Sequence, residues 1–298
     1  AKRGVIALKE EYTEAVAALE RAIRKYKDIS LHLAGSFYPA GDEFVLVYEV
    51  LGRLVPETGL PLQVGAVVQN VGTLLNIALT QKGIPVTHRY MTITGAVKKP
   101  TTLRVPIGTS VSETIALAGG IELPRWQPSV SEEDFAVVAG GPMMGKVVDD
   151  LSAPVTKITS GLIVLPKNNV VVRYLSRPLG SWVRRGRSTC DQCQDCTLLC
   201  PRHLLGHSLR PHEIMRSINY GLSWPTEIVT AAVLCCECRL CEAYACPLEL
   251  SPMAAYVEIK RQLAAQGWVN DRHKRTELTV HPMRQYRRVP THRLIARL

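Results

Sequence analysis

The sequence contains 298 residues, of which 46% are hydrophobic and 21% are charged. This composition is typical of a globular protein, and no apolar run approaches the roughly 20 residues that a membrane-spanning helix needs, so a chain that does not span a membrane is expected. The formal net charge of +10 suggests nucleic acid as a partner, but the chain has no aromatic-basic RNA motif and no zinc-finger spacing, so no nucleic-acid binding is expected.

The N-terminal part alternates strand-like and helical stretches, which is the pattern of an α/β region. Apolar residues recur at a helical period, with charges on the other face, from Glu10 to Lys27. A second helix is expected at Phe44 to Leu54, and strands are expected at Gly4 to Leu8, Ile29 to Leu33 and Val64 to Val68. Because a strand begins almost at the first residue, which is not Met, we expect upstream sequence to be missing.

The middle of the chain changes to short alternating stretches bounded by turn residues, which predict a small β-rich domain. Strands are expected at His88 to Thr94, Thr102 to Pro106, Phe135 to Val138 and Leu162 to Leu165. One short helix is expected at Ser112 to Ala118. This part is therefore expected to form a domain separate from the α/β region.

All nine cysteines lie between Cys190 and Cys246. A disulfide framework in a secreted protein would be distributed more widely, so the clustering indicates metal binding in a reducing compartment, and a cytoplasmic location is expected. Two runs follow the pattern C-x2-C-x2-C, then a fourth cysteine and proline, which is typical of bacterial 4Fe-4S ferredoxins. The runs are Cys190, Cys193, Cys196 and Cys200, and Cys235, Cys238, Cys241 and Cys246.

The fourth cysteine of each run is expected to bind the cluster of the other run, as in two-cluster ferredoxins. Cluster one then has the ligands Cys190, Cys193, Cys196 and Cys246, and cluster two has Cys235, Cys238, Cys241 and Cys200. Zinc ribbons are the alternative, although they need neither a third cysteine nor a following proline. Cys236 is out of phase with both runs and is expected to be a buried thiol. His203, His207 and His212 are possible ligands, but surface positions or positions beside the ligands are expected for them.

The segments around the two runs predict a linker and two helices. An Arg- and Gly-rich linker is expected at Arg184 to Arg187, immediately before the first cysteine. Helices are expected at Pro211 to Tyr220 and at Pro225 to Val233, between the two runs. The distance between the runs exceeds that of a minimal ferredoxin, so a helical type of ferredoxin module is predicted.

Two N-terminal segments resemble the flavin-binding 51-kDa subunit of respiratory complex I. Tyr38-Pro39-Ala40-Gly41-Asp42-Glu43 is similar to its Y-x-x-G-[ED]-E loop, and the segment 67–73, Val-Val-Gln-Asn-Val-Gly-Thr, is similar to its V-V-x-N-V-x-T segment. The resemblance implies that FMN binds to Tyr38, Gly41, Asp42, Glu43, Gln69, Asn70 and Thr73. From the residues alone, a turn at Gly41, a solvated pair at Asp42 and Glu43, and a helix N-cap at Asn70 or Thr73 remain open.

The paired cysteine runs differ from the complex I subunit and are similar to two relatives, the RnfC component of the Rnf electron-transport complex and the PduS-type cobalamin reductase of bacterial microcompartments. The C-terminal segments 283–290 and 293–295 are closer to the PduS type. The implied fold class is α/β plus β-grasp plus α-helical ferredoxin. Its expected parts are a partial FMN/NADH-binding α/β domain at 1–85, a soluble-ligand-binding β-grasp (SLBB) domain with the following strands at 86–180, a helical two-cluster 4Fe-4S domain at 181–260, and a basic C-terminal extension at 261–298.

The resemblance implies an NADH-dependent oxidoreductase that passes electrons through FMN and two 4Fe-4S clusters to a corrinoid or a redox protein. A microcompartment shell or a membrane complex is the implied partner, with the protein in the cytoplasm, inside a microcompartment, or at the cytoplasmic face of a membrane. An Rnf-type component and a non-catalytic Fe-S relay and binding scaffold are the alternatives. The family's glycine-rich loop G-R-G-G-A-G-F-P-T is absent from these residues, so FMN and NADH binding are expected only in the full-length protein.

Overall fold

A computed structural model describes residues 2–124, 129–177, 179–220, 226–268 and 277–298. It divides into two compact units, one made of Ala1–Val68 and Trp182–Arg297, the other of Gln69–Ser181 and Leu298. The first unit therefore combines the N-terminal α/β region with the cysteine-rich region. The domain boundaries predicted from the sequence stay a prediction. No helix in the described ranges is long and apolar enough to cross a bilayer.

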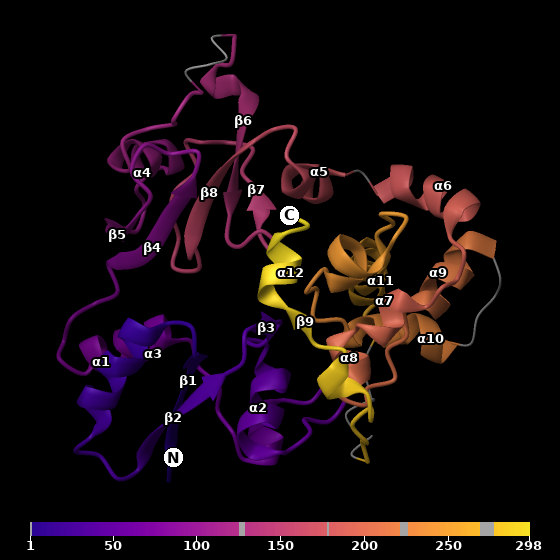
Figure 1. The fold of residues 1–298 in the computed structure, drawn as a ribbon, viewed down its shortest axis with the longest axis horizontal. Coiled ribbons are helices and arrows are strands. Elements are labelled where there is room, and N and C mark those ends of the chain that lie inside the picture. Colours follow the sequence, from indigo (N-terminus) through magenta and orange to yellow (C-terminus); the bar gives the residue numbers. More distant parts are fainter. Residues whose placement is uncertain (1, 125–128, 178, 221–225, 269–276) are drawn as a thin grey trace. The chain divides into compact units, whose positions relative to one another are not determined.

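The α/β part of the first unit begins with two parallel strands, β1 (Gly4–Lys9) and β2 (Ile29–Ala34), joined by helix α1 (Thr13–Ile23) (Figure 1). All three elements confirm the prediction, and α1 is shorter at both ends than the amphipathic stretch. A second, very short pair joins distant parts of the chain, because β3 (Phe37–Tyr38) is antiparallel to β9 (Val289–Pro290). The C-terminal segment is thus anchored beside the first flavin-like loop.

Helix α2 (Glu43–Leu51) confirms the second predicted helix, with an earlier C-terminal end. Asp42 caps its N-terminus, because the Asp42 carboxylate accepts hydrogen bonds from two backbone N–H groups of the first turn. Gly52 ends the helix in a left-handed conformation with φ of 65°. The buried face of α2 shares a core cluster with Val55 and with Leu205 from the cysteine-rich part.

The strand predicted at Val64 to Val68 is wrong. The structure has the 3-10 helix η1 (Pro61–Val64), followed by chain without regular secondary structure. Pro61 suits the first turn of a helix, where its missing N–H would have no partner. Gly65 then ends the turn with φ of 74°. The local turn chemistry outweighed the β-branched residues on which the prediction was based.

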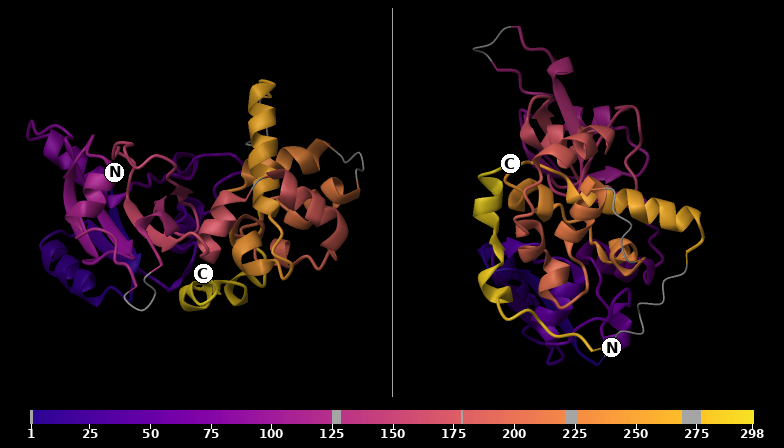
Figure 2. Two further views of the ribbon diagram at one scale, coloured as in Figure 1. Left: turned by 90° about the horizontal axis from the view of Figure 1, so that it is seen from above. Right: turned by 90° about the vertical axis from the view of Figure 1, so that its right-hand side faces the viewer.

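The cysteine-rich part of the first unit is helical, as predicted (Figure 2). Its elements after the first run begins are α7 (Asp195–Leu198), α8 (Pro201–Leu204), α9 (Pro211–Tyr220), α10 (Thr226–Thr230), η3 (Ala231–Leu234), the π-helical turn η4 (Cys241–Ala245), α11 (Pro252–Ala265), η6 (Arg284–Tyr286) and α12 (Thr291–Ile295). The first half of α11 is buried, whereas its second half extends beyond the neighbouring helices (Figure 2).

Two local predictions in this part differ from the structure. Arg184 to Arg187 do not form a linker but lie in helix α6 (Leu179–Thr189), which suits the high helix propensity of arginine. Gly186 is buried, and a Cβ atom there would come within 3.0 Å of the Asn219 Oδ1 atom. The helix predicted at Pro225 to Val233 is divided into α10 and η3, and Pro225 lies outside the described residues.

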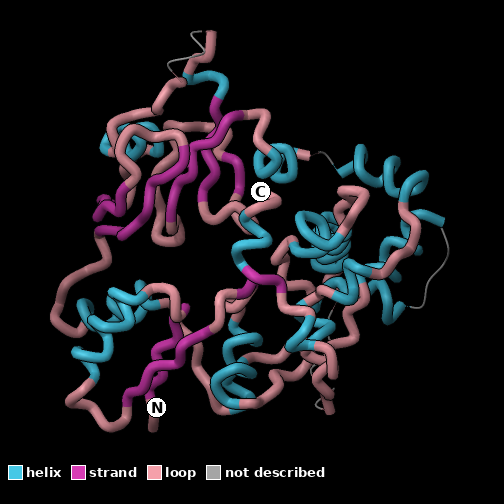
Figure 3. Tube along the Cα trace, in the orientation of Figure 1, coloured by secondary structure: helices cyan, strands magenta, loops and turns pink. Residues whose placement is uncertain are grey.

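The second unit is built on a five-stranded sheet with the order β5-β4-β8-β6-β7 (Figure 3). The strands are β4 (His88–Gly95), β5 (Thr101–Pro106), β6 (Phe135–Ala139), β7 (Lys146–Val147) and β8 (Gly161–Pro166). β4 and β8 are parallel, and the other neighbours are antiparallel. All four predicted strands are confirmed, and the two-residue β7 was not predicted.

The described part of the second unit includes the α-helices α3 (Val71–Thr80), α4 (Val111–Leu117) and α5 (Val170–Ser176) and the 3-10 helix η2 (Glu132–Asp134). The predicted helix α4 begins with a capping box, in which the Ser110 hydroxyl accepts from the Glu113 N–H and the Glu113 carboxylate accepts from the Ser110 N–H. Its apolar face packs into the core of the sheet. The unit therefore has its own hydrophobic core.

Candidate functional site

The two cysteine runs fold into loops with the same backbone geometry. Gln192 and Gln194 in the first run have φ of 61° and 69°, and Glu237 and Arg239 have φ of 58° and 66° at the matching positions of the second. Positive φ is uncommon for residues other than glycine, so its recurrence points to a functional constraint. Left-handed residues can turn successive backbone N–H groups toward one centre, and such concavities hold anionic groups, Fe-S clusters among them.

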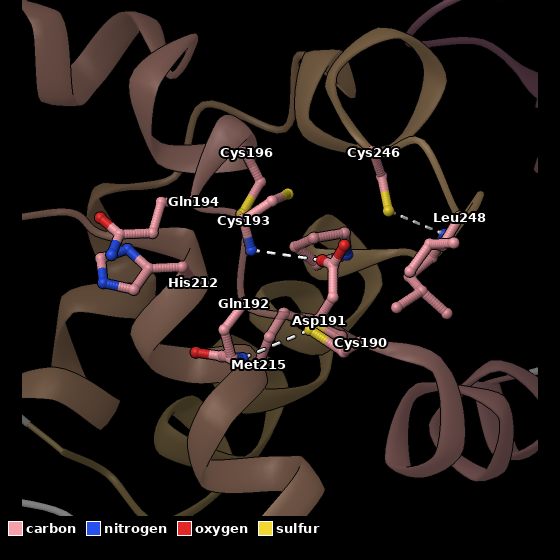
Figure 4. Close-up of a pocket in the computed structure, with 12 residues that line it drawn as sticks. Cys190, Asp191, Gln192, Cys193, Gln194, Cys196, His212, Met215, Cys246 and Leu248 are labelled. Atoms are coloured by element: carbon pink, nitrogen blue, oxygen red, sulfur yellow. Dashed lines mark hydrogen bonds between the residues drawn. The ribbon is translucent and has the colours of Figure 1, made fainter.

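The first cavity is lined by cysteines from both runs (Figure 4). Cys190, Cys193 and Cys196 come from the first loop, and Cys246, the last cysteine of the second run, lines the same space from a separate stretch of chain. Cys193 is exposed, and the other three are partly buried. The structure therefore groups Cys246 with the first run.

The second cavity contains the complementary set. Cys200, the last cysteine of the first run, lines it together with Cys235, Cys238 and Cys241 of the second run. Three of these four residues are buried, and Cys235 is partly buried. The fourth cysteine of each run thus lines the cavity of the other run, which is the arrangement that crossed ligation requires. Ligation itself stays a prediction.

Cys236 also lines the second cavity. It is partly buried, so it is less buried than expected. A hydrogen bond with the Cys238 thiol lowers the pKa of Cys236 and raises the pKa of Cys238. Cys236 therefore lies beside the four expected ligands without belonging to either run.

Hydrogen bonds to sulfur help to orient the thiols. The backbone N–H of Leu250 donates to Cys246 Sγ over 3.3 Å in the first cavity. In the second cavity, the backbone N–H of Glu237 donates to Cys235 Sγ, also over 3.3 Å. Such bonds favour the charged form of the sulfur and are among the factors that set the potential of a cluster.

The ionisation of the thiols indicates what they can bind. Burial raises the pKa of Cys196, Cys200 and Cys235 to about 12, because a thiolate is costly in apolar surroundings. A coordinated metal reverses this preference by deprotonating its thiol ligands. Within the described ranges, no three His, Cys, Asp or Glu side chains are close enough to share one metal ion. The thiols around a multi-iron cluster lie farther apart than that, since the cluster fills the space between them.

The first flavin-like loop packs against the second cavity within the same unit. The Tyr38 hydroxyl donates to the carbonyl oxygen of Cys238 over 3.0 Å. Arg202 Nη2 donates to Asp42 Oδ2 over 2.9 Å in an ion pair whose side chains are 9% and 13% exposed. The Arg202 guanidinium also stacks over the Phe44 ring, 3.7 Å from its centroid. No sequence pattern pointed to Arg202, which directly follows the proline of the first run.

The other residues of this loop differ in their solvent exposure and in their contacts with the rest of the protein. Gly41 and Glu43 are not fully buried, and nothing lies within 4 Å of the position of a Cβ atom on Gly41. Asp42 is not one of a solvated pair with Glu43, because it caps α2 and pairs with Arg202. Asp42 therefore fixes the loop, while Gly41 and Glu43 remain accessible.

The second flavin-like segment contributes Gln69, Asn70 and Thr73, which belong to the second unit and are at least partly exposed. Asn70 is the N-cap of α3, because its side-chain oxygen accepts a hydrogen bond from the Gly72 N–H over 2.9 Å. Thr73 lies in the first turn of this helix. Gln69, Asn70 and Thr73 belong to a different unit from the first flavin-like loop, so a flavin site shared by the two segments stays a prediction.

The three histidines near the first run have different surroundings. His207 is 3% exposed, and its Nε2 atom lies 3.2 Å from the Val55 carbonyl oxygen, so a surface position is wrong for it. His212 lines the first cavity, and its Nδ1 atom lies 2.7 Å from the Thr197 hydroxyl. His203 is partly buried. None of the three lines the second cavity as far as the structure describes it.

A buried carboxylate in the second loop was also missed from the sequence. Glu242, which directly follows Cys241, is 1% exposed and forms an ion pair with Arg239. It also accepts a hydrogen bond from the Ser251 hydroxyl, at the start of α11. The carboxylate therefore joins the cysteine loop to the following helix. A charged residue directly after a ligand was the only sequence signal for this role.

Comparisons with known proteins identify three domains in the chain. Residues 1–79 match the Nuo51 FMN-binding domain, residues 90–147 match the SLBB domain, and residues 189–251 match the 4Fe-4S dicluster domain. These matches and the mixed secondary structure confirm the predicted fold class. They also support FMN and 4Fe-4S clusters as the cofactors of this type of protein.

Curated relatives come from two groups. The chain is 42% identical over 299 residues to cobalamin reductase PduS of Salmonella typhimurium, covering 100% of this chain and 63% of that protein. It is 34% identical over 206 residues to the RnfC-type component of the proton-translocating ferredoxin:NAD(+) oxidoreductase complex of Clostridium ljungdahlii, covering 68% of this chain and 40% of that protein. Among solved structures, an NAD+-reducing NiFe-hydrogenase in the H2-reduced state has a TM-score of 0.47 at 18% identity, covering 91% of this chain and 50% of that chain.

The flavin-domain match, the SLBB match and the paired cysteine loops define a class of redox protein with flavin and Fe-S domains in one chain. The chain belongs to the superfamily of the complex I 51-kDa flavin subunit, in the branch that contains PduS and RnfC. It spans 63% of the length of the PduS relative.

Proposed function

We propose that this protein is an NADH-dependent flavin and iron-sulfur oxidoreductase of the PduS type, which passes electrons through FMN and two 4Fe-4S clusters to a corrinoid. The observation that carries the proposal is the division of eight thiols, drawn from two crossed runs, into two cavities. The 42% identity to PduS over the whole chain supports the same function. Because the chain spans 63% of that relative, the proposal concerns the activity of a longer protein.

The residues of the two cavities suit this role. Cluster one would be held by Cys190, Cys193, Cys196 and Cys246, and cluster two by Cys200, Cys235, Cys238 and Cys241. An Fe-S cluster accepts and releases single electrons. The left-handed residues of both loops and the hydrogen bonds to sulfur would keep the surroundings of the thiolates fixed while the charge changes.

The flavin residues divide into two roles under this proposal. Gly41, Glu43, Gln69 and Thr73 are at least partly exposed and available to contact FMN. Tyr38, Asp42 and Asn70 already make internal hydrogen bonds, so they would shape the two segments. FMN supplies the conversion between a hydride and single electrons when it is bound.

A corrinoid acceptor is favoured over an Rnf-type membrane partner because PduS matches the whole chain and the Rnf-type relative matches 68% of it. A location in the cytoplasm or in a microcompartment, with a shell or redox protein as a partner, follows from the same preference. A non-catalytic relay and scaffold is the second candidate, because the SLBB match indicates a domain that binds a soluble ligand.

Anaerobic reconstitution tests the cofactor content. We expect about eight iron and eight sulfide atoms per chain. Addition of NADH to the longer, FMN-loaded protein should bleach both the flavin bands and the broad cluster absorption. Bleaching of the clusters by dithionite but not by NADH would favour the scaffold. About four iron atoms with all cysteines intact would contradict the two-cluster assignment.

Titration of FMN tests the flavin residues through quenching of its fluorescence. We expect this chain to bind FMN weakly and the longer protein to bind it tightly, because the missing glycine-rich loop supplies backbone N–H groups to the phosphate. In the longer protein, Glu43→Ala should weaken binding by about 1–3 kcal/mol, or about 5- to 150-fold. Glu20→Ala, on the exposed side of α1, is the matched control and should leave the affinity unchanged. Equal affinity for this chain and the longer protein would refute the dependence on that loop.

A further inference from the structure

Two buried hydrogen-bond donors line the second cavity without a partner in the described residues. They are the Nη1 atom of Arg202 and the hydroxyl of Tyr256. Arg202 is 7% exposed and Tyr256 is 1% exposed, so water does not readily reach either group. Buried polar groups normally have hydrogen-bond partners. Two unpaired donors beside four thiols therefore point to an acceptor that occupies the cavity.

Arg202 is held in place from two sides. Its Nη2 atom donates to Asp42 over 2.9 Å, and its guanidinium lies over the Phe44 ring, 3.7 Å from the centroid. These contacts fix the guanidinium and leave Nη1 unpaired. Because a guanidinium has five N–H donors and stays charged, Arg202 can bind Asp42 and an anion in the cavity together.

Tyr256 is fixed by its position in the buried half of α11. A tyrosine hydroxyl is protonated at neutral pH and can donate a hydrogen bond. The sulfur atoms of a cluster are the acceptors that this cavity would offer it.

The first cavity lacks such a pair among its described residues. Its polar lining includes the carboxylate of Asp191 and the amide of Gln192, whose Nε2 atom already donates to Cys190 Sγ over 3.3 Å. No buried unpaired donor lies in this lining as far as the structure describes it. The two cavities therefore differ in the charge and in the donors that they present to a bound group.

We propose that Arg202 Nη1 and the Tyr256 hydroxyl donate hydrogen bonds to the sulfur atoms of cluster two and raise its reduction potential. The reason is electrostatic, since reduction adds a negative charge to the cluster, and charged or polar donors to sulfur stabilise the reduced form more than the oxidised form. This inference rests on the proposed presence of a cluster in the second cavity. Both residues act on the cluster as positioning and tuning residues.

The test is an EPR-monitored redox titration of the full-length protein after anaerobic reconstitution. Tyr256→Phe removes only the hydroxyl. Arg202→Lys keeps the positive charge beside Asp42 but replaces the two Nη atoms by a single nitrogen, so that no second nitrogen can donate into the cavity. Each variant is expected to shift the midpoint of cluster two to a more negative potential and to leave that of cluster one unchanged. Tyr48→Phe, which removes a hydroxyl from a ring stacked under Arg284 instead, is the matched control and should shift neither midpoint.

A second readout separates a direct hydrogen bond from a change in packing. In D2O, the exchangeable protons that donate to cluster two are replaced by deuterons. The pulsed EPR spectrum of the wild type should then contain deuterium couplings from these positions, and Tyr256→Phe should lose one of them. Wild-type protein with a normal cluster two, and unchanged midpoints in both variants, would overturn this inference alone. Wild-type protein without a cluster in the second cavity would overturn the proposed function as well.

Discussion

The two cysteine cavities repeat one motif in different surroundings. Both loops have left-handed residues at the same two positions, so the backbone presents three thiols in the same way. The first cavity has an exposed cysteine, Cys193, and its lining includes the Asp191 carboxylate and the His212 ring. The second has three buried cysteines and includes Arg202, Arg239 and Tyr256 in its lining. The loop thus sets where the thiols lie. The surrounding elements set the charge and the solvent access of each cavity.

The difference has an identifiable structural origin. The first flavin-like loop contacts two residues of the second cavity, through the hydrogen bond of Tyr38 to the Cys238 carbonyl oxygen and the ion pair of Asp42 with Arg202. The first cavity is lined by His212 and Met215 from α9. Two copies of one motif can therefore have different surroundings, because the flavin-like loop contacts residues of the second cavity.

The largest expected effect tests the crossed grouping of the ligands. Cys200→Ala should remove cluster two, and Cys246→Ala should remove cluster one. Each substitution removes one thiol from the cavity whose other three cysteines belong to the other run. Each variant should keep about four of about eight iron atoms. EPR and Mössbauer spectra identify the remaining cluster. If Cys200→Ala and Cys193→Ala damage the same cluster, the two cavities are not the two cluster sites.

A smaller effect should distinguish the second loop by its buried ion pair. Glu242→Ala removes the ion pair with Arg239 and the hydrogen bond from the Ser251 hydroxyl at a carboxylate that is 1% exposed. We expect the free energy of unfolding to fall by about 4 kcal/mol. Chemical denaturation under anaerobic conditions measures it. Glu258→Ala removes an exposed i,i+3 pair with Arg261 and is the control, with a much smaller change expected. Equal losses in the two variants would show that Glu242 does not hold the loop.

The next effect concerns pH and the core beside the second cavity. Burial, aided by Arg202 and opposed by Glu57 and Asp42, lowers the pKa of His207 from 6.5 to about 4. As the pH falls from about 6.5 to about 4, the unfolded state binds a proton that the folded state excludes. Stability should therefore be lost over this window, by about 3 kcal/mol from His207.

Denaturation midpoints across this pH range check that expectation. His207→Phe should flatten the profile, whereas His292→Phe, at an exposed position, should not. Burial also lowers the pKa of His203 and His212, so a part of the slope should remain in the variant. An unchanged slope in His207→Phe would contradict the role given to this residue.

The smallest expected effect concerns the ninth cysteine. Cys236→Ser should leave the iron content and both EPR signals unchanged, because the four expected ligands of cluster two remain. Cys235→Ser is the matched comparison, at the adjacent position, and should lose cluster two or change its spectrum. Loss of cluster two in Cys236→Ser but not in Cys235→Ser would reverse the assignment and alter the register of the second run.

Local patterns account for what the sequence alone could predict. Strands β4, β5, β6 and β8 and helices α1, α2 and α4 were expected because periodicity and turn residues act within a few positions of the chain. The spacing of the cysteines likewise indicated two ferredoxin-like loops. Predictions failed where local chemistry gave conflicting signals, as at Pro61 and Gly65, where a turn replaced a strand, and at Arg184 to Arg187, where a helix replaced a linker.

The tertiary structure alone decided which residues surround each set of thiols. Asp42 and Arg202 are 160 residues apart in the sequence, and Tyr38 and Cys238 are 200 apart, so no periodicity or spacing relates them. The unpaired donors of Arg202 and Tyr256 are defined by their burial and by the absence of a partner in the described residues. Both properties arise only when the helices and loops have packed. The sequence by itself determined that several thiols lie together in each short loop, because the spacing of the cysteines along the chain fixes this. Packing of distant segments decided how the two cavities differ, because charge and solvent access depend on everything that surrounds them.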